Sequence, residues 1–208
     1  MREPAVAIVL AAGEGTRFAG PRHKLDAEID GRSLLRRALD AATAGGIGPV
    51  LAVVPADGDR SFRTDLPAGV AAVVNAEWRR GSATSLQAGL ARAAELGVQR
   101  AVIALADQPF ISPEAWRAVA AADAPLAVAT YAGERGHPVQ LRAELWPLLP
   151  TAGDEGAKAV MRLRPDLVVE IPCAGSAVDI DTVEDLRRWQ NNSSTSSPST
   201  APSTRPGR

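Results

Sequence analysis

Short apolar runs alternate with segments of helical spacing along the first half of the chain. Four of these runs are each as long as one buried strand, at residues 6–10, 49–54, 69–74 and 101–105. Amphipathic segments at 33–42 and 83–96 lie between them. Parallel strands need long crossover connections, which are usually helices, and strands covered on both faces are apolar throughout. The alternation therefore predicts an α/β fold with a mostly parallel sheet and helices on both faces.

The second half of the chain is less regular. We expect helices at 113–122, 143–149, 157–163 and 183–190. We expect strands at 127–131, 138–141, 168–171 and 177–180, the first two forming a hairpin around the turn 133–136. From Asn191 onward the chain is rich in Ser, Thr and Pro and has no apolar residue larger than alanine or proline. Such a segment cannot offset its ordering entropy, so we predict one domain over 1–190 and a disordered tail over 191–208.

Charge and cysteine content narrow the functional classes. The formal net charge is −1 and no long basic run occurs, so nothing indicates a nucleic-acid surface. No apolar run exceeds the length of a strand and the N-terminus has no signal-peptide pattern, so we expect a cytoplasmic protein with no membrane partner. Cys173 is the single cysteine, which excludes an internal disulfide and fits a reducing compartment.

A glycine-rich turn follows the first apolar run. Its glycines let backbone N–H groups approach an anion closely, while Arg17 and Lys24 supply mobile positive charge. Only two of the 23 basic residues are lysines, Lys24 and Lys158, and the flexible lysine stem suits a site that follows a moving phosphate. We interpret this loop as a cradle for a nucleotide triphosphate. The residues expected to bind the nucleotide here are Leu10, Ala11, Ala12, Gly13, Gly15 and Thr16.

Two better-known phosphate loops do not fit this turn. A dinucleotide fingerprint needs a glycine or alanine where the chain has Phe18, and the expected ribose-binding acid is absent from 33–37. The phosphate loop of ATPases needs a Gly-Lys-Ser/Thr triplet, which the sequence lacks. The remaining alternative is an ordinary strand-to-helix turn.

Carboxylates follow two of the predicted strands. Asp107 comes directly after the strand at 101–105, where it would lie near the glycine-rich loop. Mg²⁺ is usually held by one or two carboxylates together with substrate phosphates, so Asp107 is a candidate metal ligand. Asp179 is expected to complete the site, with Asp181 as the other possibility. The alternative is that these aspartates only cap the turns and the helix that follow them.

Three further segments carry polar candidates. Asn75, Ser82 and Ser85 flank the start of the second helix, where they can bind a base or a ribose; Trp78 nearby is more typical of core cover. His137, on the predicted hairpin, is a candidate substrate contact, with a solvent-facing turn histidine as the alternative. The segment 153–158 contains Asp154 and Lys158 at the start of a helix, which can receive an anionic group of the substrate.

Taken together, six ordered motifs over roughly residues 5–190 resemble the MobA-like nucleotidyltransferases, most closely the molybdenum cofactor cytidylyltransferase branch. The motifs are a Leu-Ala-Ala-Gly loop with Arg and Lys at 10–24, Asn-x-x-Trp-x-x-Gly followed by Ser-Leu-x-x-Gly-Leu at 75–90, Ala-Asp-Gln-Pro at 106–109, Gly-His-Pro-Val at 136–139, Gly-Asp-x-Gly-Ala at 153–157 and Asp-Ile-Asp-Thr-x-Glu-Asp at 179–185. One departure is the long spacer 18–23 between Arg17 and Lys24.

The resemblance implies a Rossmann-like three-layer sandwich similar to nucleotide-diphospho-sugar transferases. It implies transfer of a nucleotide from CTP, or GTP, to the phosphate of a pterin, with Mg²⁺ as cofactor and release of pyrophosphate. Arg17, Lys24 and Asp107 would be the catalytic residues, and His137, Asp154, Lys158 and Asp181 would bind the acceptor. A molybdoenzyme could receive the product. The alternatives are another phosphorylated acceptor, such as a sugar or polyol phosphate, or an NAD(P)-dependent oxidoreductase on the same scaffold.

Overall fold

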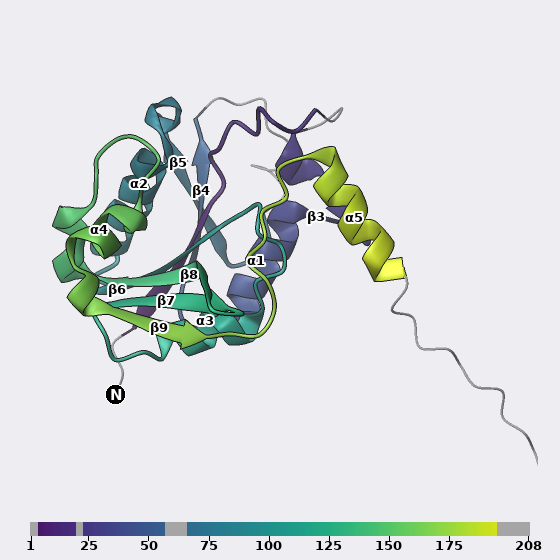
Figure 1. Cartoon of the computed structure of the whole chain (residues 1–208). Helices are drawn as coiled ribbons and strands as arrows, with labels where there is room; N and C mark the ends of the chain where they lie inside the picture. The colour runs from purple at the N-terminus through teal and green to yellow at the C-terminus, as the bar shows by residue number, and fades with distance from the viewer. Residues whose placement is uncertain (1–3, 20–22, 57–65, 195–208) are drawn as a thin grey trace, which may run out of the picture.

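The computed structural model describes residues 4–19, 23–56 and 66–194 (Figure 1). Residues 195–208, which make up most of the tail predicted to be disordered, lie outside the described residues. The last helix, α5 (Val183–Ser194), extends past the predicted domain boundary at residue 190. In the described part of the chain no helix combines the length and the apolar character that crossing a membrane requires.

A seven-stranded sheet forms the centre of the fold, in the order β5-β4-β1-β6-β8-β7-β9. The strands are β1 (Ala5–Leu10), β4 (Val50–Pro55), β5 (Val70–Asn75), β6 (Arg100–Leu105), β7 (Leu126–Tyr131), β8 (Glu134–Arg142) and β9 (Val168–Pro172). Strand β1 pairs in parallel with both β4 and β6, and only β8 runs antiparallel to its neighbours. The predicted mostly parallel sheet is confirmed.

Helices cover both faces of this sheet. The strands alternate their side chains, so Ala7 and Val9 of β1 join one core while Val6 and Ile8 join the other. Helices α1 (Leu34–Gly45) and α3 (Pro113–Ala120) pack on the first core, and α2 (Ser82–Glu95) and α4 (Ala157–Leu163) pack on the second. The three-layer arrangement expected from the sequence is confirmed.

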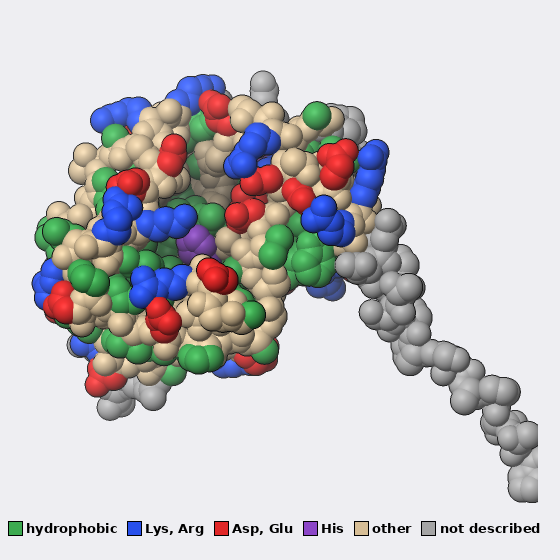
Figure 2. Space-filling model, viewed as in Figure 1, with side chains coloured by type: hydrophobic (Ala, Val, Ile, Leu, Met, Phe, Trp, Pro, Cys, Tyr) green, Lys and Arg blue, Asp and Glu red, His purple; other side chains and the backbone are tan. Residues whose placement is uncertain are grey.

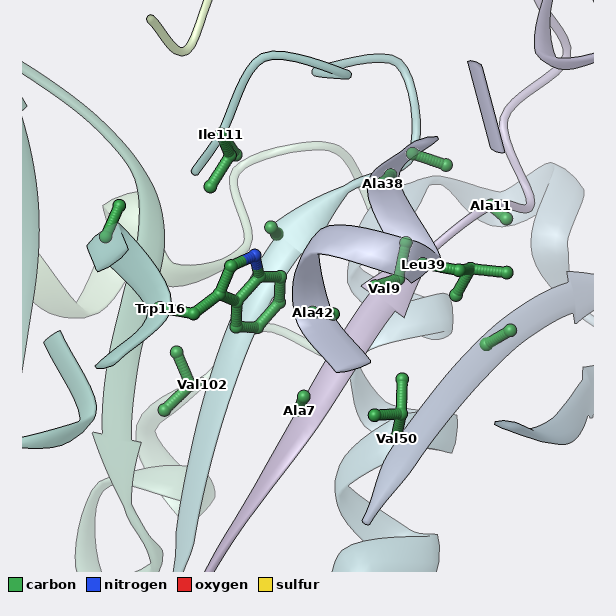
Figure 3. Packing of buried hydrophobic residues seen from close by; sticks show 14 of the residues in the cluster. Ala7, Val9, Ala11, Ala38, Leu39, Ala42, Val50, Val102, Ile111 and Trp116 are labelled. Atoms are coloured by element: carbon green, nitrogen blue, oxygen red, sulfur yellow. The ribbon is translucent and has the colours of Figure 1, made fainter. Parts of the chain in front are cut away.

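Trp116 anchors α3 in the first core. Its side chain is 1% exposed and lies near Val102 of β6 and Ala42 of α1 (Figure 3). Gly45 at the end of α1 permits this packing, because a Cβ atom there would lie 2.9 Å from the Trp116 Cβ. Complete burial of an aromatic side chain of this size contributes roughly 3 kcal/mol. The first core thus fixes the layer behind β1 and β6, the two strands that end at the site described below.

Two local predictions differ from the structure, and one short hairpin was not predicted. Residues 177–180 form no strand; the segment crosses the edge of the sheet, where Ile180 N donates to the Asp107 carbonyl at 2.9 Å. The segment 143–148 is a 3-10 helix, with Pro147 inside it. A two-residue hairpin around Asp30-Gly31, both with positive φ, joins the short strands β2 (Glu28–Ile29) and β3 (Arg32–Ser33) and was not predicted.

Candidate functional site

Three chain segments meet at the carboxyl ends of β1 and β6. They are the glycine-rich loop after β1, the turn 106–109 after β6 and the segment 177–182 that leads into α5. Figure 2 shows a hollow in this face, with a histidine side chain inside it and acidic and basic side chains around it. The hollow contains two adjoining cavities of about 350 and 910 Å³. Both cavities are lined by Leu10, Ser82, Leu105 and Asp154.

Lys24 is the centre of an ion-pair network at the smaller cavity. Its Nζ lies 2.6 Å from Asp107 Oδ2 and 3.0 Å from Asp181 Oδ1. The other oxygen of Asp181, Oδ2, lies 3.1 Å from Nη2 of Arg17. The Lys24 side chain is 10% exposed and that of Arg17 is 76% exposed. The fold therefore brings together Arg17, Lys24 and Asp107, the three residues predicted to be catalytic, and adds Asp181.

The carboxylates keep Lys24 charged. Burial alone would lower the pKa of the ammonium, but the charges and hydrogen bonds of Asp107 and Asp181 outweigh burial, and the pKa of Lys24 is raised above its ordinary value. A buried cation of this kind requires paired carboxylates, because removing one partner leaves a charge in a poorly solvated place. Lys24 is thus held as a cation at the position where an incoming anion can reach it.

Asp179 lies outside this network. Its Oδ1 accepts a hydrogen bond from Gln108 Nε2 at 2.8 Å, and the same nitrogen donates to the Ala177 carbonyl at 3.1 Å. Burial, together with the nearby charge of Asp107, raises the pKa of Asp179. Gln108 is 5% exposed, and its two hydrogen bonds hold the segment 177–179 in place. Asp179 thereby lies in the wall of the larger cavity.

The donor set suits a divalent cation that is held partly by substrate. Among the described residues, no three or more His, Cys, Asp or Glu side chains form a metal-binding group. Asp107 Oδ1 is buried and accepts no hydrogen bond within the described part of the chain, which fits an oxygen reserved for a cation. One or two carboxylates completed by phosphate oxygens is how Mg²⁺ is usually bound. That Asp179 completes the metal-binding set with Asp107 remains a prediction. Asp181 already shares an ion-pair partner with Asp107, the ammonium group of Lys24.

The smaller cavity lies between the glycine-rich loop and the start of α2. Six residues predicted to bind nucleotide line it: Leu10, Ala11, Ala12, Gly13, Ser82 and Ser85. Gly15 and Thr16 do not line it. Asn75 is buried and donates from Nδ2 to the hydroxyls of Thr84 and Ser85 at 2.9 and 3.0 Å, so it supports the first turn of α2.

A strap formed by Gly153 and Asp154 closes the N-terminus of α2. Asp154 Oδ1 accepts from the backbone N–H of Ser82 at 2.9 Å, and the Gly153 carbonyl accepts from Ala83 N at 2.9 Å. Gly81 has φ +109, and a Cβ atom there would lie 2.4 Å from the Gly153 oxygen. Only glycine permits this approach, which places Asp154 at the boundary between the two cavities.

The larger cavity contains three of the four residues predicted to bind the acceptor: His137, Asp154 and Lys158. Asp181, the fourth, is in the Lys24 network instead. Burial, opposed by the charge of Asp107 and reinforced by that of Lys158, lowers the pKa of His137 to about 4, so this imidazole is neutral near pH 7. Apolar side chains form much of the remaining wall: Leu86, Ile103, Val128, Val139 and Met161.

Trp78 and Arg79 are among the residues of the smaller cavity that the sequence reasoning did not assign to the site. Trp78 is 7% exposed, as expected of core cover, yet it also lines the cavity. Arg79 lines the cavity too, with its guanidinium carbon 4.4 Å from the centre of the Trp78 ring. An arginine that directly follows a tryptophan, two residues before a glycine and the start of a helix, is the signal that could have indicated this cation–π pair.

Comparison with known proteins places this geometry among nucleotide-handling enzymes. The 2-C-methyl-D-erythritol 4-phosphate cytidylyltransferase of Rhodococcus opacus (strain B4) is 37% identical over 82 residues, which are 39% of this chain and 36% of that enzyme. The chain therefore spans about a third of that relative's length.

Two solved structures cover nearly the whole fold. The homologue of Mycobacterium tuberculosis Rv0371c from Mycobacterium sp. strain JC1 has a TM-score of 0.76 and 26% identity, covering 92% of this chain and 98% of its own. Rv0371c of M. tuberculosis H37Rv in complex with manganese has a TM-score of 0.72 and 25% identity, covering 90% and 98%. The sequence model of the MobA-like NTP transferase domain matches residues 7–169, and the chain belongs to this family.

Proposed function

We propose that this protein transfers a cytidylyl group from CTP to the phosphate of a small acceptor and releases pyrophosphate. The observation that carries the proposal is the pair of adjoining cavities with a shared boundary at Leu10, Leu105 and Asp154. The smaller cavity has Lys24 and Asp107 in its wall and the larger one has His137 and Lys158. Two substrates bound in this way would meet beside the Lys24 network. Membership of the MobA-like family and the similarity to a cytidylyltransferase support the same reaction.

The reaction needs positioning and charge neutralisation more than proton transfer. An oxygen of the acceptor phosphate attacks the α-phosphorus of CTP, the bond from that phosphorus to the bridging oxygen breaks, and pyrophosphate leaves with the bonding electrons. A phosphate monoester has a second pKa of about 6 and is largely ionised near neutrality, so no general base is required. The neutral His137 is then a hydrogen-bonding residue rather than a proton acceptor for the reaction.

The residues of the site would have distinct roles in this reaction. Lys24 and Arg17 would bind the triphosphate and neutralise the charge that develops on the departing pyrophosphate. Asp107, with Asp181 or Asp179, would hold a divalent cation, which supplies further neutralisation of the phosphates. The manganese complex of Rv0371c supports a divalent cation at such a site, and Mg²⁺ is the cation we propose here.

The comparisons favour a polyol or sugar phosphate as the acceptor. The relative from R. opacus is named for a polyol phosphate, and none of the matches reported above is named for a pterin. A second candidate is the pterin phosphate that the sequence motifs imply. It is favoured by the apolar wall of the larger cavity, because residues such as Leu86, Val128 and Met161 suit a flat ring better than a chain of hydroxyls. A molybdoenzyme partner follows only from this second candidate.

Thermal melting with CTP, GTP, ATP and UTP, each with and without Mg²⁺, tests the nucleotide. We expect CTP with Mg²⁺ to stabilise the protein most, because ligands that bind only the folded state raise its melting temperature. Incubation of CTP with a panel containing polyol phosphates, sugar phosphates and a pterin phosphate then identifies the acceptor by its cytidylylated product. Stabilisation by NADPH in place of any nucleotide triphosphate would favour the oxidoreductase alternative and contradict the proposal.

A further inference from the structure

The ammonium group of Lys24 lies between two carboxylates that are suited to a metal. Its Nζ is within 3.0 Å of oxygens of both Asp107 and Asp181, and the three side chains are 10%, 18% and 23% exposed. One positive charge in this position satisfies the two acidic groups at once. Arg17 contributes a second cation, but among the described residues its ion pair is with Asp181, and it is largely exposed, where an ion pair is worth little.

The same two carboxylates would have to serve a metal during the proposed reaction, with Asp107 offering Oδ1, which accepts no hydrogen bond within the described part of the chain. Mg²⁺ binds carboxylate oxygens at about 2.0–2.1 Å and requires near-octahedral geometry. An ammonium that already contacts Asp107 Oδ2 at 2.6 Å and Asp181 Oδ1 at 3.0 Å occupies the space between the two carboxylates and repels the incoming cation. Lys24 and a divalent cation are therefore alternative occupants of one position.

We propose that Lys24 holds the metal position between Asp107 and Asp181 in the nucleotide-free protein, and that the triphosphate of the nucleotide draws Lys24 away so that the metal can enter. This inference rests on the proposed function, since it requires that nucleotide and metal bind at this site. The phosphates provide Lys24 with a new anionic partner, and the Asp107 carboxylate is released to the metal at the same time. Nucleotide and metal binding are coupled through one side chain, and each must strengthen the other by the same factor.

Asp179 distinguishes this exchange from a general effect of negative charge. It belongs to the same acidic segment as Asp181, but its Oδ1 is bound by Gln108 and it has no contact with Lys24 within hydrogen-bond distance among the described residues. Removal of Lys24 therefore frees Asp107 and Asp181 and leaves the hydrogen bond from Gln108 to Asp179 in place.

Electron paramagnetic resonance of Mn²⁺ without nucleotide tests the exchange directly. We expect Lys24→Met to bind Mn²⁺ about tenfold more tightly than the wild type, within the usual range of coupling between sites. Arg36→Met is the matched control, because it removes a cation paired with Asp40 at 2.9 Å on α1, away from both cavities. This control should bind Mn²⁺ like the wild type.

A non-hydrolysable CTP analogue supplies the second measurement. It should increase the Mn²⁺ affinity of both proteins, because its phosphate oxygens complete the ligand set, but the increase should be about tenfold larger in the wild type, since only there does Lys24 have to be displaced. Lys24→Gln serves if the Met variant does not fold. Equal or weaker Mn²⁺ binding by folded Lys24 variants, or no effect of the analogue on wild-type Mn²⁺ affinity, overturns the exchange. Those results leave the transferase proposal intact if the wild type still releases pyrophosphate from CTP.

Discussion

Lys24 Nζ and Asp107 Oδ2 are 2.6 Å apart although the two residues are separated by 83 positions in the sequence. The contact joins the loop after β1 to the turn after β6, two neighbouring strands in the middle of the sheet. Asp181 adds a third segment to the same ammonium group. The proposed reaction depends on this junction, because it lies in the wall of the smaller cavity beside the boundary with the larger one.

Asp107→Asn tests the carboxylate with little change in shape. The amide oxygen can still accept from Lys24, so the fold should survive, but the charge that would hold a divalent cation is lost. We expect nucleotidyl transfer to fall by about 100-fold or more, measured as pyrophosphate release. Activity within a few-fold of the wild type would show that Asp107 is only a structural partner of Lys24.

Gly81→Ala tests the contact between α2 and the strap at 153–154. A Cβ atom would lie 2.4 Å from the Gly153 oxygen, and the backbone at φ +109 is strained for any other residue. We expect a clear fall in melting temperature together with weaker CTP binding, because Ser82 would be displaced.

Gly97→Ala is the control for this backbone effect. Gly97 also has positive φ, at +69, but no atom lies within 4 Å of the added Cβ. This variant should cost about 1–2 kcal/mol of stability and leave CTP affinity unchanged. Equal effects of both substitutions would mean that backbone strain alone, and not the approach to Gly153, matters at residue 81.

His137 should make the protein sensitive to mild acid. Burial chiefly, with Lys158 adding and Asp107 opposing, lowers the pKa of His137 from 6.5 to about 4. Between these values the unfolded chain binds a proton that the folded protein does not, so stability is lost as the pH falls from about 6.5 towards 4. Thermal melts at pH 7 and pH 5 should differ less in His137→Gln than in the wild type. A His137 ring signal in the folded protein that titrates near pH 6.5 would contradict this account.

Lys158→Met tests the acceptor cavity without touching the Lys24 network. The side chain lies in the wall of the larger cavity and makes no ion pair among the described residues, so it is available to an anionic acceptor. Loss of one charge-assisted hydrogen bond should raise the KM for the acceptor about tenfold or more and leave CTP affinity unchanged. A change in CTP affinity with an unaltered acceptor KM would assign Lys158 to the nucleotide instead.

The central architecture could be predicted because its signals are local. The apolar runs that became β1, β4, β5 and β6 are continuous, and helices separate most of them. The segment 177–180 was predicted wrongly as a strand because its residues look extended and apolar by alternation. What holds it is the Asp107 carbonyl and the Gln108 side chain, contacts from a distant part of the chain that periodicity cannot reveal.

The sequence predicts which residues form the site better than it predicts which of their side chains contact each other. Loop positions and the ends of strands pointed to Arg17, Lys24 and Asp107, and the structure brings all three together. The alternation of side chains along a strand could not predict that Asp179 pairs with Gln108 while Asp181 pairs with Lys24. Ile180, between them, is buried. That division depends on side-chain hydrogen bonds across the sheet edge, which spacing along the sequence does not encode.

Pyrophosphate release is the most direct test of the proposed activity. The purified protein is incubated with CTP and Mg²⁺, with and without a panel of phosphorylated acceptors that includes a polyol phosphate and a pterin phosphate. We predict pyrophosphate only when an acceptor is present, in amounts that match the cytidylylated product. If none of the four nucleotide triphosphates yields pyrophosphate with any acceptor, the assignment of this site to nucleotidyl transfer is wrong.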